Sequence, residues 1–384
     1  MKYYDYIITG AGAAGLMLAY RLAKDSYFDQ KSILIIDPIK RISGDRTWSF
    51  WENGAGEWDT LVSKSWNSVI FANSDSHLNL SLCPYRYKMI QSEDFYQEVW
   101  SVIGSKSNIK FLKQEIVKLI PNNKNVEVHT NKKSFKASKV FNSIPNADNY
   151  NKQNKYPVLK QHFVGWFIKT DSCCFNPSNA TFMDFDIPQE GNTRFMYVLP
   201  LNSKEALVEY TLFSKDLLNY SSYESGIKSY LDLKGITNYE ILRKEQGAIP
   251  MTSYPFSTHN SSNILNIGTN GGWTKASTGY TFNNCSKKTR DLISHLKRNS
   301  DLSMFEKKSR FYFYDMLFLD VLTTKNHLGS MLFSNLFYNV DIKTIFRFLD
   351  NSSNFKEDFK IITSFPKKIF IRAIIRRLFC SKAH

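Results

Sequence analysis

A glycine-rich turn near the N-terminus restricts the fold of this chain more than any other feature. The segments YDYIITG and SILIIDP have the apolar runs of buried strands, and AGLMLAYRLAKD between them has helical periodicity. Gly10, Gly12 and Gly15 lie between the first strand and the helix, spaced as G-x-G-x-x-G. In this motif the glycines permit a tight turn, close approach of a pyrophosphate and close packing of helix on strand. The sequence therefore predicts a βαβ dinucleotide-binding unit.

The turn also indicates where the dinucleotide would bind. We expect contacts from the turn residues Gly10, Ala11, Gly12, Ala13, Ala14 and Gly15. The diphosphate would lie at the helix N-terminus, where free N–H groups and the helix dipole favour an anion. Asp37 ends the second strand, 22 residues after Gly15, where a carboxylate accepts hydrogen bonds from ribose hydroxyls. An acid at this position, rather than Arg, favours FAD or NAD over NADP.

A second glycine-rich strand, loop and helix follows about 250 residues later, at 264–282. Its sequence is ILNIGTNGGWTKASTGYTF, and its candidate flavin contacts are Gly268, Thr269 and Gly279. Two distant glycine-rich segments are the usual layout of FAD proteins, in which both segments close around the isoalloxazine. The pair of segments therefore favours FAD as the cofactor.

The composition excludes several classes of protein. With 42% hydrophobic and 15% aromatic residues, the 384-residue chain is too apolar to be disordered. Its net charge of +15 favours an anionic partner, such as nucleic acid, a membrane surface or a cofactor. The Lys and Arg residues are scattered and no nucleic-acid-binding motif is present, so we expect no nucleic acid partner. The five cysteines lack zinc-ligand spacing, and no G-x-S-x-G motif indicates a hydrolase.

The sequence also bears on the location of the protein. No apolar run reaches the roughly 20 residues that span a bilayer. The N-terminus leads straight into the first strand, without the pattern of a signal peptide. We therefore expect a cytoplasmic protein that is soluble or lies on the surface of a membrane.

One carboxylate is unusual in the β-rich middle of the chain. The segment ALVEYT, at 206–211, belongs to a longer apolar run that favours a strand. Alternation along this strand defines two faces, one with Leu207, Glu209, Thr211 and Phe213, the other with Val208, Tyr210 and Leu212. Neither is the polar face of a solvated strand. Glu209 is thus a candidate buried acid, and the alternative is a glutamate that faces solvent or pairs with a nearby Lys or Arg.

The order of the expected elements indicates a mixed α/β fold in three parts. The first part is a discontinuous FAD-binding domain, and the second is an antiparallel β-sheet domain for the substrate, interrupted by a helix near 222–234. The third part is helical and increasingly basic. The expected ranges are 1–45, 85–155 and 246–300 for the first part, 46–84 and 156–245 for the second, and 301–384 for the third.

Several of these segments, in the same order, resemble the bacterial FAD-dependent lycopene β-cyclases of carotenoid biosynthesis. DYIITGAGAAGLMLAYRL is similar to their nucleotide-binding start, and RTWSFW to their Thr-Trp-Ser-Phe signature. QHFVGWFI, FMYVLPL, ALVEYTLFS and EQGAIPMT are similar to their central strands and to a Glu-x-Gly-x-x-Pro turn. GTNGGWTKASTGYTF is similar to their second flavin loop. The chain has Lys275–Ala276 where many relatives have His-Pro, and Thr269 where related flavoproteins often have Asp.

The resemblance implies both a fold and an activity. The fold would be the Rossmann-like FAD-binding type of p-hydroxybenzoate hydroxylase and geranylgeranyl reductase, with an antiparallel substrate sheet and a helical C-terminus. The activity would close the acyclic ψ-ends of lycopene to β-ionone rings, towards γ-carotene and β-carotene, without net redox change. The family's essential acid matches Glu209, and its FAD is reduced by NAD(P)H but not consumed.

This chemistry needs a protonated acid, stabilisation of a carbocation away from water, and a long apolar cavity. Burial would raise the pKa of Glu209 and keep it protonated. A reduced flavin and aromatic faces would stabilise the cation. The candidate lining residues are Trp48, Phe50, Trp51, Trp166 and Tyr197, each with core packing as the alternative role. Glu245, in EQGAIP, is a candidate for tuning the flavin or a proton route, with a structural pair as the alternative.

The C-terminal segment FPKKIFIRAIIRRLF suggests contact with a membrane. It places Ile369, Ile371, Ile374, Ile375 and Phe379 among basic residues. Because lycopene dissolves in the bilayer, a basic amphipathic helix would bring the enzyme to the anionic inner face of the cell membrane. The alternative is a terminal helix that packs on its own domain and leaves a basic face in solvent.

Two other functions stay open on the sequence alone. A redox flavoenzyme of the same fold, such as an FAD-dependent monooxygenase or an isoprenoid reductase, would share the glycine-rich turn but would need no acid at Glu209. A protein that binds carotenoid or flavin without catalysis would also fit.

Overall fold

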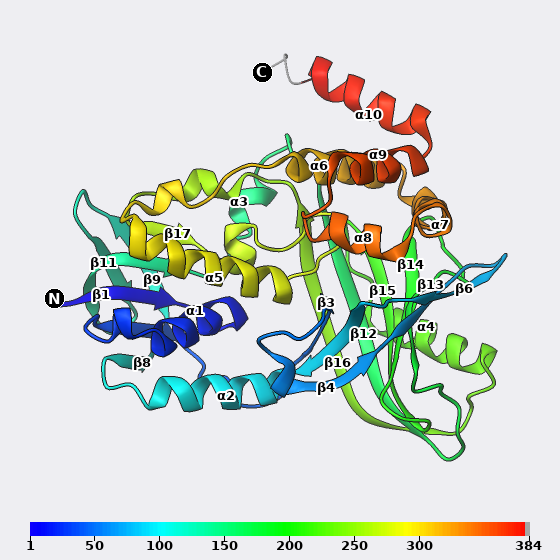
Figure 1. Cartoon of the computed structure of the whole chain (residues 1–384), viewed down its shortest axis with the longest axis horizontal. Helices are drawn as coiled ribbons and strands as arrows, with labels where there is room; N and C mark the ends of the chain where they lie inside the picture. Colours follow the sequence, from blue (N-terminus) through cyan, green and yellow to red (C-terminus); the bar gives the residue numbers. More distant parts are fainter. Residues whose placement is uncertain (381–384) are drawn as a thin grey trace.

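The computed structural model describes residues 1–380, with side chains described to residue 378. Two large sheets lie at opposite ends of the long axis, and a helical layer covers part of the second sheet (Figure 1). A small third sheet lies between them. Within the described residues, no helix is long and apolar enough to cross a membrane.

The first sheet contains the glycine-rich turn. Its strand order is β8-β2-β1-β11-β10-β9, and β17 pairs with β11. The central strands are parallel, as expected for strands linked by a βαβ crossover, whereas β9 and β10 are antiparallel. Its strands are β1 (Lys2–Thr9), β2 (Ile33–Asp37), β8 (Ile109–Lys113), β9 (Ile116–Pro121), β10 (Val126–Thr130), β11 (Ser134–Asn142) and β17 (Ile264–Asn266).

Helix α1 (Ala13–Lys24) covers this sheet together with α2 (Ser92–Gly104) and α5 (Phe282–Arg298). Nearly all residues of α1 are buried, because it packs between α2 and α5. The segment between β17 and α5 is the second glycine-rich loop. A short helix, α3 (Asp148–Asn151), lies beyond β11. The two glycine-rich segments are therefore parts of one structural unit.

The second sheet has the order β16-β12-β15-β14-β13-β5-β6. It is antiparallel except where β13 pairs with β5. Its strands are β5 (Ser68–Ala72), β6 (His77–Ser81), β12 (Val158–Thr170), β13 (Asn179–Asp184), β14 (Thr193–Pro200), β15 (Glu205–Ser214) and β16 (Tyr239–Thr252). The small sheet, of order β3-β7-β4, comprises β3 (Thr47–Asn53), β4 (Val62–Trp66) and β7 (Tyr85–Gln91).

The two faces of the second sheet are covered by different helices. Helix α4 (Tyr220–Leu233) packs on one face, with Val208, Tyr210 and Leu212 of β15. The helical layer packs on the other face, with Leu207 and Phe213. This layer comprises α6 (Arg310–Thr324), α7 (Gly329–Asn339), α8 (Ile342–Leu349), α9 (Phe355–Ser364) and α10 (Lys367–Cys380). The two strand faces expected from alternation are thus confirmed.

Candidate functional site

The first glycine-rich turn has the geometry that its sequence predicts. Gly10 has φ of 98°, a conformation that favours glycine, and its N–H donates to Ile36 O at 2.8 Å. A side chain at Gly15 would collide with the carbonyl oxygen of Gly10. At Gly12, by contrast, a Cβ atom would meet no protein atom within 4 Å. Space for a ligand therefore lies over the start of α1, which has no side-chain cap.

Asp37 supports this turn directly. Its carboxylate is buried, and Oδ2 accepts a hydrogen bond from the Ala11 N–H at 2.7 Å. Oδ1 accepts from the Ile39 N–H at 2.8 Å. Each oxygen can accept a further hydrogen bond, so these contacts are compatible with the predicted ribose contact. The sequence motif did not indicate that Asp37 also holds the glycine-rich turn.

The second glycine-rich loop meets the first. A Cβ atom at Gly268, which has φ of 62°, would lie 2.8 Å from the Ala14 side chain. Thr269 is half-buried in the same turn, 3.5 Å from Thr274 between their hydroxyl oxygens. Gly279 has φ of 75°, and a side chain there would collide with Gln161 of β12. The loop therefore reaches from the start of α1 to the second sheet.

Glu209 lies in a row of residues that crosses the second sheet. In β15 it is directly opposite Tyr197 of β14 and Gly165 of β12, and Gly165 is opposite Glu245 of β16. Residues directly opposite one another in antiparallel strands point to the same face. Tyr197, Glu209 and Glu245 therefore share one face, which is also the face that the second glycine-rich loop reaches.

Burial makes Glu209 a weak acid that keeps its proton. The residue is 7% exposed, and its Oε1 accepts a hydrogen bond from the Thr211 hydroxyl at 2.6 Å. Burial, followed by the charge of Glu245, raises the pKa of Glu209 to about 8, although the bond from Thr211 acts in the opposite direction. The prediction of a buried carboxyl is confirmed, and the solvent-facing alternative is wrong.

Three tyrosines lie near this acid: Tyr87 is buried, and Tyr197 and Tyr280 are half-buried. The hydroxyls of Tyr87 and Tyr197 are 2.6 Å apart. Burial raises the pKa of both groups, and of Tyr280, so all three stay neutral. Tyr280 comes from the second glycine-rich loop, and its ring meets that of Trp51 edge-on at 4.4 Å. No local sequence pattern singles out Tyr87 or Tyr280, because they meet only after the small sheet and this loop pack together.

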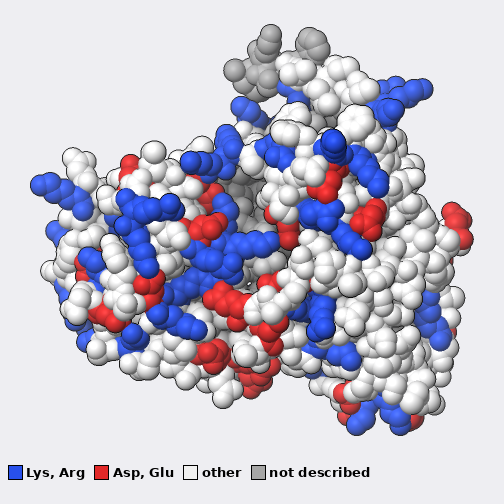
Figure 2. Space-filling view, viewed as in Figure 1, with Lys and Arg blue, Asp and Glu red and all other residues white. Residues whose placement is uncertain are grey.

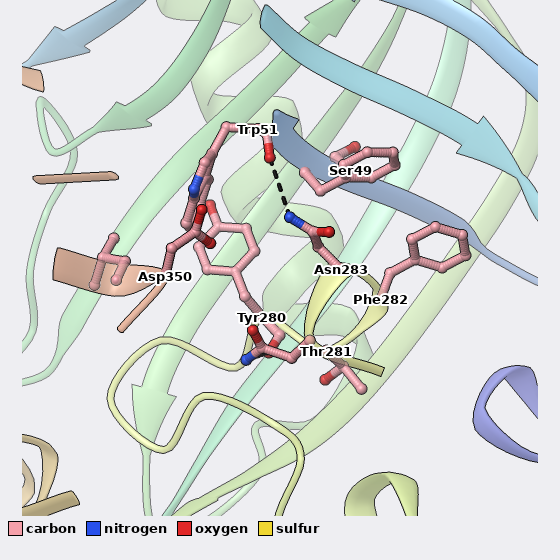
Figure 3. A pocket seen from close by; sticks show the side chains of 10 residues that line it. Ser49, Trp51, Tyr280, Thr281, Phe282, Asn283 and Asp350 are labelled. Atoms are coloured by element: carbon pink, nitrogen blue, oxygen red, sulfur yellow. Dashed lines mark hydrogen bonds between the residues drawn. The ribbon is translucent and has the colours of Figure 1, made fainter. Parts of the chain in front are cut away.

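A small pocket lies beside Tyr280 (Figure 3). It is lined by residues from β3, from the segment 280–284 and from the end of α8. In the figure, Trp51, Tyr280 and Asp350 lie together, and the side-chain amide of Asn283 donates to the Trp51 carbonyl at 3.3 Å. Elsewhere on this face, aromatic side chains of the sheet and of the helical layer pack against one another.

Three of the five candidate lining residues pack in other parts of the core, which is their alternative role. Trp166 follows Gly165 in β12, so it points to the opposite face and packs in the core beneath α4. Trp51 and Tyr197 do lie on the face of Glu209. Trp48 and Phe50 instead stack on Phe282, in the core beneath the first sheet's helices. An aromatic residue type alone does not show on which face of a strand the side chain lies. Alternation along β12 places Trp166 on the face opposite Glu209.

Comparison with known proteins agrees with this geometry. A family model described as lycopene cyclase protein matches residues 5–376. The chain belongs to the lycopene cyclase family. The lycopene β-cyclase of Pantoea ananas is 25% identical over 265 residues, which cover 65% of this chain and 63% of the relative. That of Pseudescherichia vulneris is 26% identical over 259 residues, covering 65% and 62%. This lycopene cyclase family member therefore aligns with just under two thirds of the length of these curated relatives.

Solved structures with the same fold include proteins whose names state a flavin. A geranylgeranyl bacteriochlorophyll reductase-like protein from Thermoplasma acidophilum has a TM-score of 0.57 at 12% identity, covering 98% of this chain and 97% of its own. A flavin-dependent brominase has a TM-score of 0.57 at 14% identity, with 98% and 99% covered. These similarities confirm the predicted fold class for this lycopene cyclase family member.

Proposed function

We propose that this protein is an FAD-dependent lycopene β-cyclase, which closes the acyclic ψ-ends of lycopene without net redox change. The observation that supports this function best is Glu209: a buried carboxyl that is protonated at neutral pH, on the sheet face that the second glycine-rich loop reaches. An isolated carbon–carbon double bond is a poor base, so an acid must start protonated and remain shielded from water to act on it.

The reaction begins when Glu209 gives its proton to C2 of a ψ-end. The neighbouring double bond then attacks the tertiary cation and closes the ring, and loss of a proton from C6 leaves the β-ionone ring. The neutral rings of Tyr197, Tyr280 and Trp51 present electron-rich faces near the acid and resist attack by the cation. Because one proton enters and one leaves, the substrate and the product are isomers.

The glycine-rich segments fit a flavin dinucleotide. The open space over Gly12 and the uncapped start of α1 suit its diphosphate, and Gly268 and Gly279 suit close approach of the second loop. When bound and reduced by NAD(P)H, FAD would supply an electron-rich ring beside the cation. Asp37 would accept from its ribose while holding the turn through Ala11.

Expression in cells that accumulate lycopene tests this function. We expect new monocyclic or bicyclic carotene from the wild-type protein. Glu209→Gln should lower the rate by about 10²–10⁴-fold, because the amide cannot donate a proton to carbon. The purified variant should retain FAD, as measured by flavin absorbance. Unchanged lycopene, together with NAD(P)H consumption stimulated by another compound, would instead support the redox flavoenzyme of this fold.

We also propose that the protein docks on an anionic membrane surface through two helices. In α10 the exposed side chains are Lys367, Lys368, Ile371, Arg372, Ile375, Arg376 and Leu378. In α9 they include Phe355, Lys356, Phe359, Lys360 and Ile362. Each helix thus has an exposed apolar stripe at i, i+4 and i+7, with a basic residue following each of the first two apolar positions.

The opposite face of α10 holds it to the protein. Ile369, Phe370 and Ala373 pack against the core of the helical layer, and Arg377 pairs with Asp320 of α6 at 2.7 Å. Of the segment predicted to bind the membrane, the side chain of Phe379 and residues 381–384 lie outside the described part. Basic side chains are spread over the face of the molecule in Figure 2, including its helical end. Their charge suits anionic headgroups on the cytoplasmic leaflet.

A further inference from the structure

Glu245 is the second carboxyl on the face of Glu209. A Cβ atom at Gly165 would lie 3.5 Å from Cβ of Glu209 and 3.4 Å from Cγ of Glu245. Both glutamates therefore lean over the same glycine, from β15 on one side and from β16 on the other. The absence of a side chain at Gly165 allows the two carboxyl-bearing side chains to approach across three strands.

Glu245 also borders an open cavity. Strand β16 is the edge strand of the sheet, and a cavity of about 430 Å³ lies there, lined by Asp45, Tyr220, Lys244, Glu245 and Gln246. The side chain of Glu245 is 7% exposed. It therefore lies between a buried acid and a space large enough for several water molecules. Glu209 itself is hydrogen-bonded to Thr211, which is fully buried and offers no route to water.

Both positively and negatively charged groups lie around Glu245. Thr47, the first residue of β3, donates to its Oε2 at 3.0 Å. Just before that strand, Arg46 lowers the pKa of Glu245 and Asp45 raises it. On β16 itself, Nη2 of Arg243 lies 4.0 Å from Oε2. Burial outweighs these groups and raises the pKa of Glu245. Across Gly165, the negative charge of Glu245 raises the pKa of Glu209. A proton can therefore move between the two carboxyls without creating a pair of buried charges.

We propose that Glu245 is a relay residue that returns a proton from the cavity to Glu209 after each ring closure. This proposal rests on the proposed function. In each turnover Glu209 loses one proton to C2, and one proton leaves C6 for water. Glu245 takes a proton from water in the cavity and passes it to the Glu209 carboxylate, so protons balance. No oxidant or reductant takes part in these transfers.

Infrared spectroscopy of the holoenzyme tests the relay without using catalysis. The C=O band of protonated Glu209 is assigned as the band that Glu209→Gln removes. In D₂O this band shifts as the carboxyl exchanges, and we expect the exchange to be about tenfold slower or more in Glu245→Gln. We also expect Glu209 to titrate at lower pH in this variant, because the neighbouring negative charge is gone. Equal exchange rates in the two proteins would overturn the relay.

Turnover in D₂O gives a second readout. The wild-type product should carry deuterium at C2. Glu245→Gln should lower kcat about tenfold or more with little change in KM, and Glu245→Asp should restore much of it. If Glu245→Gln folds poorly, Thr47→Val provides a milder change, which removes the hydrogen bond at Oε2 and the longer one that the Thr47 hydroxyl accepts from Arg243. A wild-type product without deuterium at C2 would mean that Glu209 recovers the C6 proton itself. A protein that cyclises no lycopene at all, but still shows slowed exchange, would contradict the proposed function and leave the relay intact.

Discussion

At the scale of single residues, the proposed function makes activity depend on pH through Glu209. Its pKa is about 8 in the folded protein and near 4.5 as an ordinary carboxyl. The proton-donating form therefore predominates below about pH 8, and we expect kcat to fall as pH rises through this value. Thr211→Val removes the hydrogen bond that lowers the pKa and should move this fall to higher pH. A pH–rate profile that is flat between pH 6 and 9 would contradict this assignment.

The same residue should make stability depend on pH. Between about pH 4.5 and 8 the folded protein holds a proton on Glu209 that the unfolded chain releases. Rising pH therefore favours unfolding across this window. Glu209→Gln removes the effect, so the variant should be more stable than wild type at pH 8, by roughly 4 kcal/mol, and within about 1 kcal/mol of it at pH 5. Thermal unfolding at the two pH values measures the difference.

At the scale of elements, different glycines of the glycine-rich turn are needed for folding and for cofactor binding. A side chain at Gly15 would collide with Gly10, whereas one at Gly12 would meet only open space. We expect Gly15→Ala to lower the melting temperature of the protein without cofactor. Gly12→Ala should change that temperature little, yet weaken FAD binding about tenfold or more, because a diphosphate needs this space. Equal FAD affinity in Gly12→Ala and wild type, measured by fluorescence titration, would contradict binding at this turn.

The elements show which features sequence alone could predict. The helix expected near 222–234 is α4 (Tyr220–Leu233), because its buried apolar residues recur at helical spacing. Alternation in β15 placed Glu209 correctly, since a strand buried on both faces leaves no polar face. Recognition of the family gave the fold, but not the contacts between distant segments. The positions of Tyr87 and Tyr280 depend on packing between distant segments, and so do the hydrogen bonds by which Asp37 supports the turn. No local sequence pattern indicates this packing. The sequence analysis did not predict the apolar stripe of α9 either. Lysines lie between its apolar residues in the sequence, and only the helix places Phe355 and Phe359 on one face.

At the scale of the whole molecule, the second glycine-rich loop joins three parts of the structure. Gly268 meets α1, Gly279 meets β12, and Lys275 reaches into the helical layer. The buried ammonium of Lys275 lies 3.0 Å from Asp315 of α6 and donates to Asn351 at 2.7 Å. Lysine at this position, where many relatives have His, therefore has a specific partner in this chain. The loop, the sheet face of Glu209 and the helical layer are thus packed as one site.

Under the proposed function, this packing means that the helical layer would have to move for a carotene to reach Glu209. Side chains such as Phe185, Phe213 and Phe333 fill the space between the sheet and this layer. The outer helices of the layer, α9 and α10, are also the ones with exposed apolar stripes. We therefore expect contact with the bilayer to occur beside the part of the molecule that must open, which would let the substrate pass without crossing water.

Vesicle binding tests this arrangement. Phe355 and Phe359 are 74% and 68% exposed, and Ile371 and Ile375 are 52% and 49% exposed. Transfer of each side chain into the acyl boundary is favourable by roughly 1–2 kcal/mol. We expect Phe355→Ser with Phe359→Ser, and Ile371→Ser with Ile375→Ser, each to weaken cosedimentation with phosphatidylglycerol vesicles at least about tenfold.

The matched control is Val117→Ser with Leu233→Ser, two side chains of similar exposure, 68% and 65%, on other surfaces. This pair should bind vesicles as the wild type does. Raising the salt concentration should weaken wild-type binding, because the basic residues beside each stripe act through screened charges. Vesicles of phosphatidylcholine alone should bind weakly for the same reason. Wild-type protein that ignores anionic vesicles at low salt, or a control pair that loses binding as much as the helix variants, would contradict docking through α9 and α10.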